Sequence, residues 1–193
     1  MRAAATLFRR NGYAATGINE IAELAGAPKG SLYHYFPDGK GQIGEAAVRF
    51  AAKGVVATLE KLEHEHKSAA AMIQAYCRLL VGWMAKSGFR DGCPISTTLL
   101  ESAPQSQGIA LAGREAFAAW RAVIARALLR DGFSKLEAGQ LSTLAVSSIE
   151  GALILARVAS SGEPIEDVAR SLAVVLRKNT PPRKRATLKE AMP

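Results

Sequence analysis

Residues 16–36, TGINEIAELAGAPKGSLYHYF, decide the fold. Apolar residues at helical spacing predict a first helix that Thr16 caps. Gly26 suits the left-handed position that ends this helix, and Pro28 suits the first turn of a second helix over 28–36. A helix, a tight turn containing glycine and a short second helix form the helix-turn-helix arrangement, whose second helix enters the major groove of DNA.

The second helix of this motif has two different faces. Leu32 and Phe36 are four residues apart and share one face, which we expect to be buried. Lys29 and Tyr33 share another face, which suits DNA because lysine can reach a base edge and tyrosine a phosphate. Tyr35 flanks the buried stripe and suits either face. The residues that we expect to contact DNA are Thr16, Asn19, Lys29, Gly30, Ser31, Tyr33, His34, Tyr35 and Lys40.

The rest of the chain also predicts helices, so the expected fold class is all-α. Asp38 suits the cap of a long helix to about Lys67. Further helices are expected over residues 68–86, 96–101, 108–130, 134–159 and 164–178. The predicted organisation is a three-helix DNA-binding domain over 1–40, a helical bundle over 41–179, and a basic disordered tail over 180–193.

Composition and charge narrow the class of protein. The 193 residues carry a net charge of +8, of which +2 lies in residues 1–40 and +5 in residues 177–193, so a polyanionic partner is favoured. The N-terminus has no apolar segment typical of a secretory signal, and the least charged window, 138–156, is interrupted by polar residues. The interrupted window predicts no membrane span. Because two cysteines cannot build a disulfide framework, we also expect a cytoplasmic protein.

Motifs typical of enzymes are missing from the sequence. Gly39-Lys40-Gly41 lacks the remaining residues of a phosphate-binding loop, and no dinucleotide-binding or nucleophile-elbow string occurs. His64 and His66 are two residues apart, which places them on different faces of a helix and disfavours a metal site. Cys93 is expected to be a packing thiol. We therefore expect no catalysis, no cofactor and no metal.

Residues 6–40, TLFRRNGYAATGINEIAELAGAPKGSLYHYFPDGK, closely resemble the N-terminal DNA-binding domain of TetR/AcrR-family transcriptional regulators. The strings at 37–40 and 92–95, PDGK and GCPI, resemble the LmrA/YxaF-like branch of that family. Family members usually have further residues ahead of the stretch that begins here at Met1. Two alternatives follow: the native chain starts upstream of Met1, or the first helix is shortened and the phosphate contacts of a basic arm are missing. The resemblance implies a long linking helix, an effector-binding bundle and two C-terminal helices that dimerise.

The resemblance implies an effector pocket between the middle helices, although core packing explains the same aromatic residues equally well. The candidate lining residues are Met72, Tyr76, Trp83, Phe89, Phe117 and Trp120. No charged residue among the middle helices stands out as a partner, so we expect a small, mostly apolar or aromatic effector.

The nearly uncharged window 138–156 predicts an interface with a second copy, since a chain of this size covers only part of such a helix. A helix buried wholly within its own chain is the alternative. The residues that we expect at the dimer interface are Leu144, Ser147, Ser148, Gly151, Ala152, Leu155, Val168 and Leu172.

These features together predict a homodimeric repressor that an effector releases from a palindromic operator. Two other classes remain open at this point. The first is a non-specific nucleic-acid binder that uses mainly its basic tail, and the second is a carrier or enzyme with a vestigial helix-turn-helix.

Overall fold

The computed structural model describes residues 1–177, and these residues confirm the all-α prediction. The helices are α1 (Arg2–Asn11), α2 (Ile18–Ala25), α3 (Lys29–Tyr35), α4 (Lys40–Glu65), α5 (Ala69–Lys86), α6 (Pro94–Ser102), α7 (Gln107–Arg130), α8 (Lys135–Ala159) and α9 (Glu163–Val175). The predicted tail over 180–193 and the last predicted helical residue, Lys178, lie outside the described residues.

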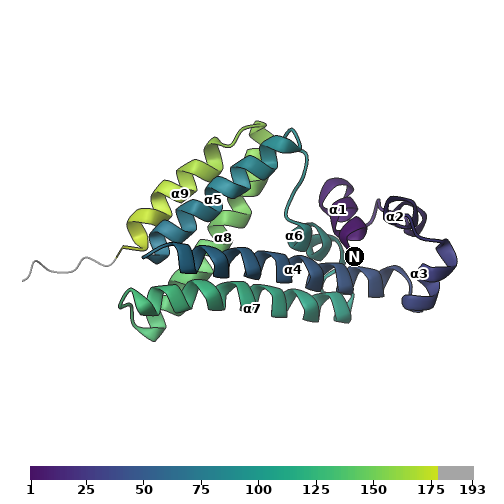
Figure 1. Cartoon of the computed structure of the whole chain (residues 1–193), viewed down its shortest axis with the longest axis horizontal. Coiled ribbons are helices and arrows are strands. Elements are labelled where there is room, and N and C mark those ends of the chain that lie inside the picture. The colour runs from purple at the N-terminus through teal and green to yellow at the C-terminus, as the bar shows by residue number, and fades with distance from the viewer. Residues whose placement is uncertain (178–193) are drawn as a thin grey trace, which may run out of the picture.

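The long helix α4 connects two groups of helices (Figure 1). Helices α1, α2 and α3 gather at its N-terminal end, α7 runs along its side, and α5, α8 and α9 form a bundle toward its C-terminal end. Because α4 takes part in both groups, a displacement of its axis would move one group relative to the other.

Each group has its own apolar core. The small core joins Phe8, Ile21 and Leu32 from the first three helices to Ile43 and Ala47 of α4. The large core is built by the six helices from α4 to α9. Tyr13, in the turn between α1 and α2, packs against both cores and lies 5.2 Å from the ring of Phe8.

Several predicted helix ends are confirmed. Ser68 Oγ accepts a hydrogen bond from the Ala71 N–H at the start of α5. Ser134 begins α8 through a reciprocal capping box with Glu137. Gly26 ends α2 with φ 62°, a left-handed conformation in which only glycine avoids steric cost.

Two predicted caps are wrong. Gly17, not Thr16, caps α2, and its N–H donates to Glu20 Oε2 at 2.7 Å. Asp38 does not cap α4, which begins after Gly39 in a conformation with φ 69°. In both cases the residue that caps the helix lies one position later than the side-chain pattern predicts.

By length and composition alone, α8 is apolar enough to cross a membrane, with a mean hydropathy of 1.5. The core helix of a soluble protein has the same composition. Here α8 packs against α7 and α9 and buries Ala145, Ile149 and Ala156 completely. Its apolar character is therefore partly explained by the large core.

Candidate functional site

Helix α3 presents the predicted recognition face to solvent. Leu32 is buried in the small core and Phe36 packs against it, as expected for the inward face. The side chains of Tyr33 and Tyr35 are 56% and 71% exposed. Lys29, Gly30 and His34 are also exposed, whereas Ser31 is half-buried. A basic residue, a histidine and two tyrosines thus share the outer side of a helix fixed from behind by apolar contacts.

The residues predicted around α3 differ in their accessibility. Asn19 is exposed on α2. Thr16 is fully buried, and its hydroxyl donates to the Gly12 carbonyl at 2.7 Å. The expectation that Thr16 offers its hydroxyl to a phosphate is therefore wrong, because that hydroxyl closes the turn after α1.

Lys40 is half-buried at the start of α4 and already has partners. Its ammonium Nζ donates to the Ala14 carbonyl at 3.0 Å and lies 4.7 Å from the ring centre of Tyr13. In this conformation Lys40 stabilises the turn between α1 and α2. Its contact with a phosphate stays a prediction.

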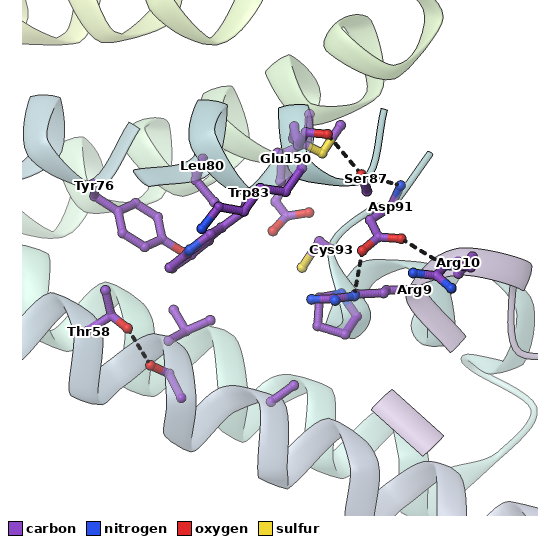
Figure 2. A pocket seen from close by; sticks show the side chains of 18 of the residues that line it. Arg9, Arg10, Thr58, Tyr76, Leu80, Trp83, Ser87, Asp91, Cys93 and Glu150 are labelled. Atoms are coloured by element: carbon purple, nitrogen blue, oxygen red, sulfur yellow. Dashed lines mark hydrogen bonds and ion pairs between the residues drawn. The ribbon is translucent and has the colours of Figure 1, made fainter. Parts of the chain in front are cut away.

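A pocket of about 490 Å³ opens between the two groups of helices (Figure 2). Walls come from α4, α5, α7 and α8, from the segment that links α5 to α6, and from the last turn of α1. The residues that line it are Arg9, Arg10, Ala51, Gly54, Val55, Thr58, Tyr76, Leu80, Trp83, Met84, Lys86, Ser87, Asp91, Gly92, Cys93, Pro94, Trp120, Glu150 and Leu153.

Three of the predicted effector residues meet in this pocket. The Tyr76 ring lies 6.5 Å from Trp83 and 5.9 Å from Trp120, both in edge-to-face arrangements. The other three predicted residues do not line it: Met72 is fully buried in the core, Phe117 stacks on Trp120 at 6.2 Å, and Phe89 packs against the core. Helical spacing alone did not distinguish the aromatic and apolar residues that line the pocket from those buried in the core.

The pocket also contains a carboxyl group that the sequence analysis missed. Glu150 Oε2 accepts a hydrogen bond from Ser96 Oγ at 2.6 Å, while Glu150 Oε1 is buried without a hydrogen-bond partner. Burial raises the pKa of Glu150, and hydrogen bonds from Ser96 and Cys93 oppose this shift. The expectation that no charged residue stands out among the middle helices is wrong for this pocket. The signal was present, because Glu150 is the sole charged residue of window 138–156.

The pocket touches the DNA-binding end of the molecule through α1. Arg9 Nε and Arg10 Nε lie 2.9 Å and 3.4 Å from the two carboxylate oxygens of Asp91, whose side chain is 10% exposed. The N–H of the next residue, Gly92, donates to the Arg9 carbonyl at 2.9 Å. The segment between α5 and α6, which forms one wall of the pocket, is therefore bonded directly to the last turn of α1.

The residues predicted for a dimer interface are only partly accessible. Leu144, Ser147 and Leu155 are exposed on α8, and Ser148, Gly151 and Val168 are half-buried. Ala152 and Leu172 are 1% and 3% exposed within their own chain, so their assignment to the interface is wrong. Four further apolar residues outside the predicted set are also exposed: Ile154, Val158, Val174 and Val175. Continuing the helical period from Leu144 to Val158 would have found two of them.

Comparisons with known proteins agree with this architecture. Residues 1–47 match the family described as bacterial regulatory proteins, tetR family. Residues 69–171 match the C-terminal domain of LmrA/YxaF-like transcriptional regulators.

Relatives along the whole chain are transcriptional regulators and not enzymes, as predicted. The chain is 34% identical to the HTH-type regulator YxaF of Bacillus subtilis, covering 92% of this chain and 93% of YxaF. It is 29% identical to LmrA of the same organism, covering 92% of this chain and 95% of LmrA. A TetR regulator structure from Legionella pneumophila superimposes with a TM-score of 0.81 at 20% identity, covering 91% of this chain and 94% of that one. The chain thus belongs to the TetR family of DNA-binding, ligand-responsive transcriptional regulators, in its LmrA/YxaF-like branch.

Proposed function

We propose that this regulator is a homodimeric repressor, which binds a palindromic operator and leaves it when a small effector occupies the pocket. The observation that carries the proposal is the outer face of α3, where Lys29 and Tyr33 are exposed one helical turn apart. Lysine at this position reaches a guanine edge, and tyrosine and His34 donate to phosphates. Asn19, Gly30, Ser31, Tyr35 and Lys40 complete the proposed DNA contacts.

Dimerisation is proposed through α8 and α9. Exposed apolar side chains recur along one side of α8 at Leu144, Leu155 and Val158, and Val174 and Val175 continue them on α9. The small residues Ser147, Ser148 and Gly151 lie on this same side and would allow two α8 helices to cross closely. The proposal requires that a twofold axis at this surface hold the two α3 helices about 34–36 Å apart, which is the spacing of successive major grooves.

Effector binding is proposed to act through two connections. The first is α4, which contributes Ala51, Val55 and Thr58 to the pocket and Ile43 to the small core. The second is the attachment of Asp91 to α1. A mostly apolar or aromatic effector that favours a different placement of these two elements would change the distance between the recognition helices, and so weaken operator binding.

The proposed domain boundaries are those predicted from the sequence. Residues 1–40 are the DNA-binding domain, and residues 41–179 hold the effector site and the interface between copies. The proposed location is the cytoplasm, where a repressor has access to its operator.

The test is selection of bound sequences from random duplex DNA by the purified protein. A palindrome with a defined half-site spacing is the expected result, since it reports specificity and the twofold axis together. Recovery of unrelated sequences would contradict the proposal.

Removing residues 180–193 then separates specific recognition from non-specific binding through the basic end of the chain. Our proposal expects a modest loss of affinity and a smaller dependence on salt. Collapse of all DNA binding would favour the non-specific class.

A further inference from the structure

Among residues 1–177, the buried side-chain nitrogen and oxygen atoms without a hydrogen-bond partner are Arg9 Nε, Trp120 Nε1 and Glu150 Oε1. All three residues line the same pocket. Arg9 Nε has Asp91 as an ionic partner at 2.9 Å. The indole N–H of Trp120 and the second oxygen of Glu150 have none. Because buried polar groups in native proteins are nearly always paired, these two atoms indicate a partner that the pocket is built to receive.

Glu150 also forms no ion pair with a cation in the part of the chain that the structure describes. Arg9 and Arg10 reach the same pocket, but both are paired with Asp91. Lys86 lines the pocket from the end of α5, where it is exposed. A buried carboxyl group without a counter-charge is costly, and burial raises its pKa accordingly. A positive group inside the pocket would remove this cost.

Three aromatic rings line the same pocket as this carboxyl group. Tyr76 meets both Trp83 and Trp120 edge to face. In Figure 2 the carboxyl group of Glu150 lies between Tyr76 and Trp83 on one side and Cys93 and Asp91 on the other. Faces of tryptophan and tyrosine attract cations electrostatically, and most strongly where water is excluded. The pocket therefore combines a carboxyl group without a counter-charge with rings suited to an ammonium group.

We infer that the effector is an amine, whose ammonium group binds Glu150 and whose aromatic or apolar body packs against Tyr76, Trp83 and Trp120. This inference rests on the proposed effector site and names its specificity-determining residue. The indole N–H of Trp120 is then available to an oxygen acceptor on the same molecule. Tightest binding is expected for amines that carry such an acceptor.

The test uses three probes with one body and different ends: 2-(2-naphthyl)ethylamine, 2-(2-naphthyl)ethanol and 2-naphthylacetic acid. Titration calorimetry on the full chain, without DNA, measures binding of each. We expect the amine to bind at least roughly tenfold more tightly than the alcohol and the acid, because only the amine brings a positive charge that pairs with the carboxylate of Glu150. Equal binding of amine and alcohol, tighter binding of the acid, or no binding of the amine would overturn the inference.

The variant Glu150→Gln keeps the size of the side chain and removes its charge. It should abolish the preference for the amine while leaving the affinity for the alcohol unchanged. The matched control is Glu65→Gln, at an exposed position far along α4, which should leave both affinities unchanged. Because the comparison of probes on the unaltered chain needs no variant, the inference stays testable even if Glu150→Gln does not fold. Operator selection is a separate measurement, so loss of the amine preference with intact DNA specificity would reject this inference alone.

Discussion

Arg9 Nε, in the last turn of α1, lies 2.9 Å from an oxygen of Asp91, in the segment between α5 and α6 that lines the pocket. This ion pair connects the first helix of the DNA-binding end to a wall of the pocket without passing through α4. A ligand that displaces the wall must also displace α1 or break the pair.

Replacing Asp91 by asparagine should therefore loosen α1. The change removes the charge that pairs with both Arg9 and Arg10 and leaves their guanidinium groups partly uncompensated. We expect the free energy of unfolding to fall by about 1–2 kcal/mol, since the carboxylate is buried but the arginines are partly exposed. Urea denaturation measures this, and hydrogen exchange should accelerate in α1. Asp167→Asn, which breaks the exposed pair with Arg170, is the control and should change stability by less than about 0.5 kcal/mol.

Tyr33→Ala should strongly weaken operator binding while leaving the fold and the oligomeric state intact. The side chain is 56% exposed and contributes little to the small core. Losing one recognition contact costs about 1–3 kcal/mol, which weakens binding roughly tenfold or more in each half-site. Fluorescence anisotropy with the selected operator measures the change. Leu129→Ala, an exposed residue of α7, should bind like the unaltered chain. Unchanged binding by Tyr33→Ala would count against the recognition face.

Glu150→Gln should stabilise the ligand-free protein at neutral pH but not in acid. The folded chain raises the pKa of this carboxyl above its ordinary value of 4.5, so ionisation favours the unfolded state. The penalty is absent below the ordinary pKa and grows as the pH rises toward the folded value. The pKa values of Cys93 and Tyr76, which are themselves raised by burial, keep both groups neutral over this interval. Thermal unfolding at pH 4 and pH 7 measures the difference. A variant with the same advantage at both pH values would contradict this explanation.

Val158→Asp should convert the proposed dimer into a monomer. Val158 is 82% exposed near the end of α8, so an aspartate there is harmless to the single chain and buries a charge only if a partner covers it. Light scattering after gel filtration reports the mass, and operator affinity should fall together with it. Leu100→Asp, at a residue of α6 that is 77% exposed, should leave the mass unchanged. A dimer that survives Val158→Asp would place the interface elsewhere.

The recognition face was predictable because it depends on local spacing. Lys29 and Tyr33 lie one helical turn apart, and the apolar period that buries Leu32 leaves them outside. The same reasoning failed at Thr16, whose hydroxyl turns back to the Gly12 carbonyl. A threonine just before a helix can cap that helix or close the preceding turn, and the sequence pattern is the same in both cases. Only the path of the preceding chain distinguishes the two roles.

The sequence by itself determined the helical fold, the helix-turn-helix and the choice of residues on the outer side of α3, because helix periodicity and turn chemistry act over a few neighbouring positions. Only the tertiary structure decided which aromatic residues face a cavity, since Tyr76 and Trp120 come from different helices while Met72, on the same helix as Tyr76, lies in the core. It alone also brought Glu150 into that cavity and Asp91 onto Arg10, across 81 positions in the latter case. Pairings over such distances depend on how the helices pack, and no local pattern in the sequence encodes them.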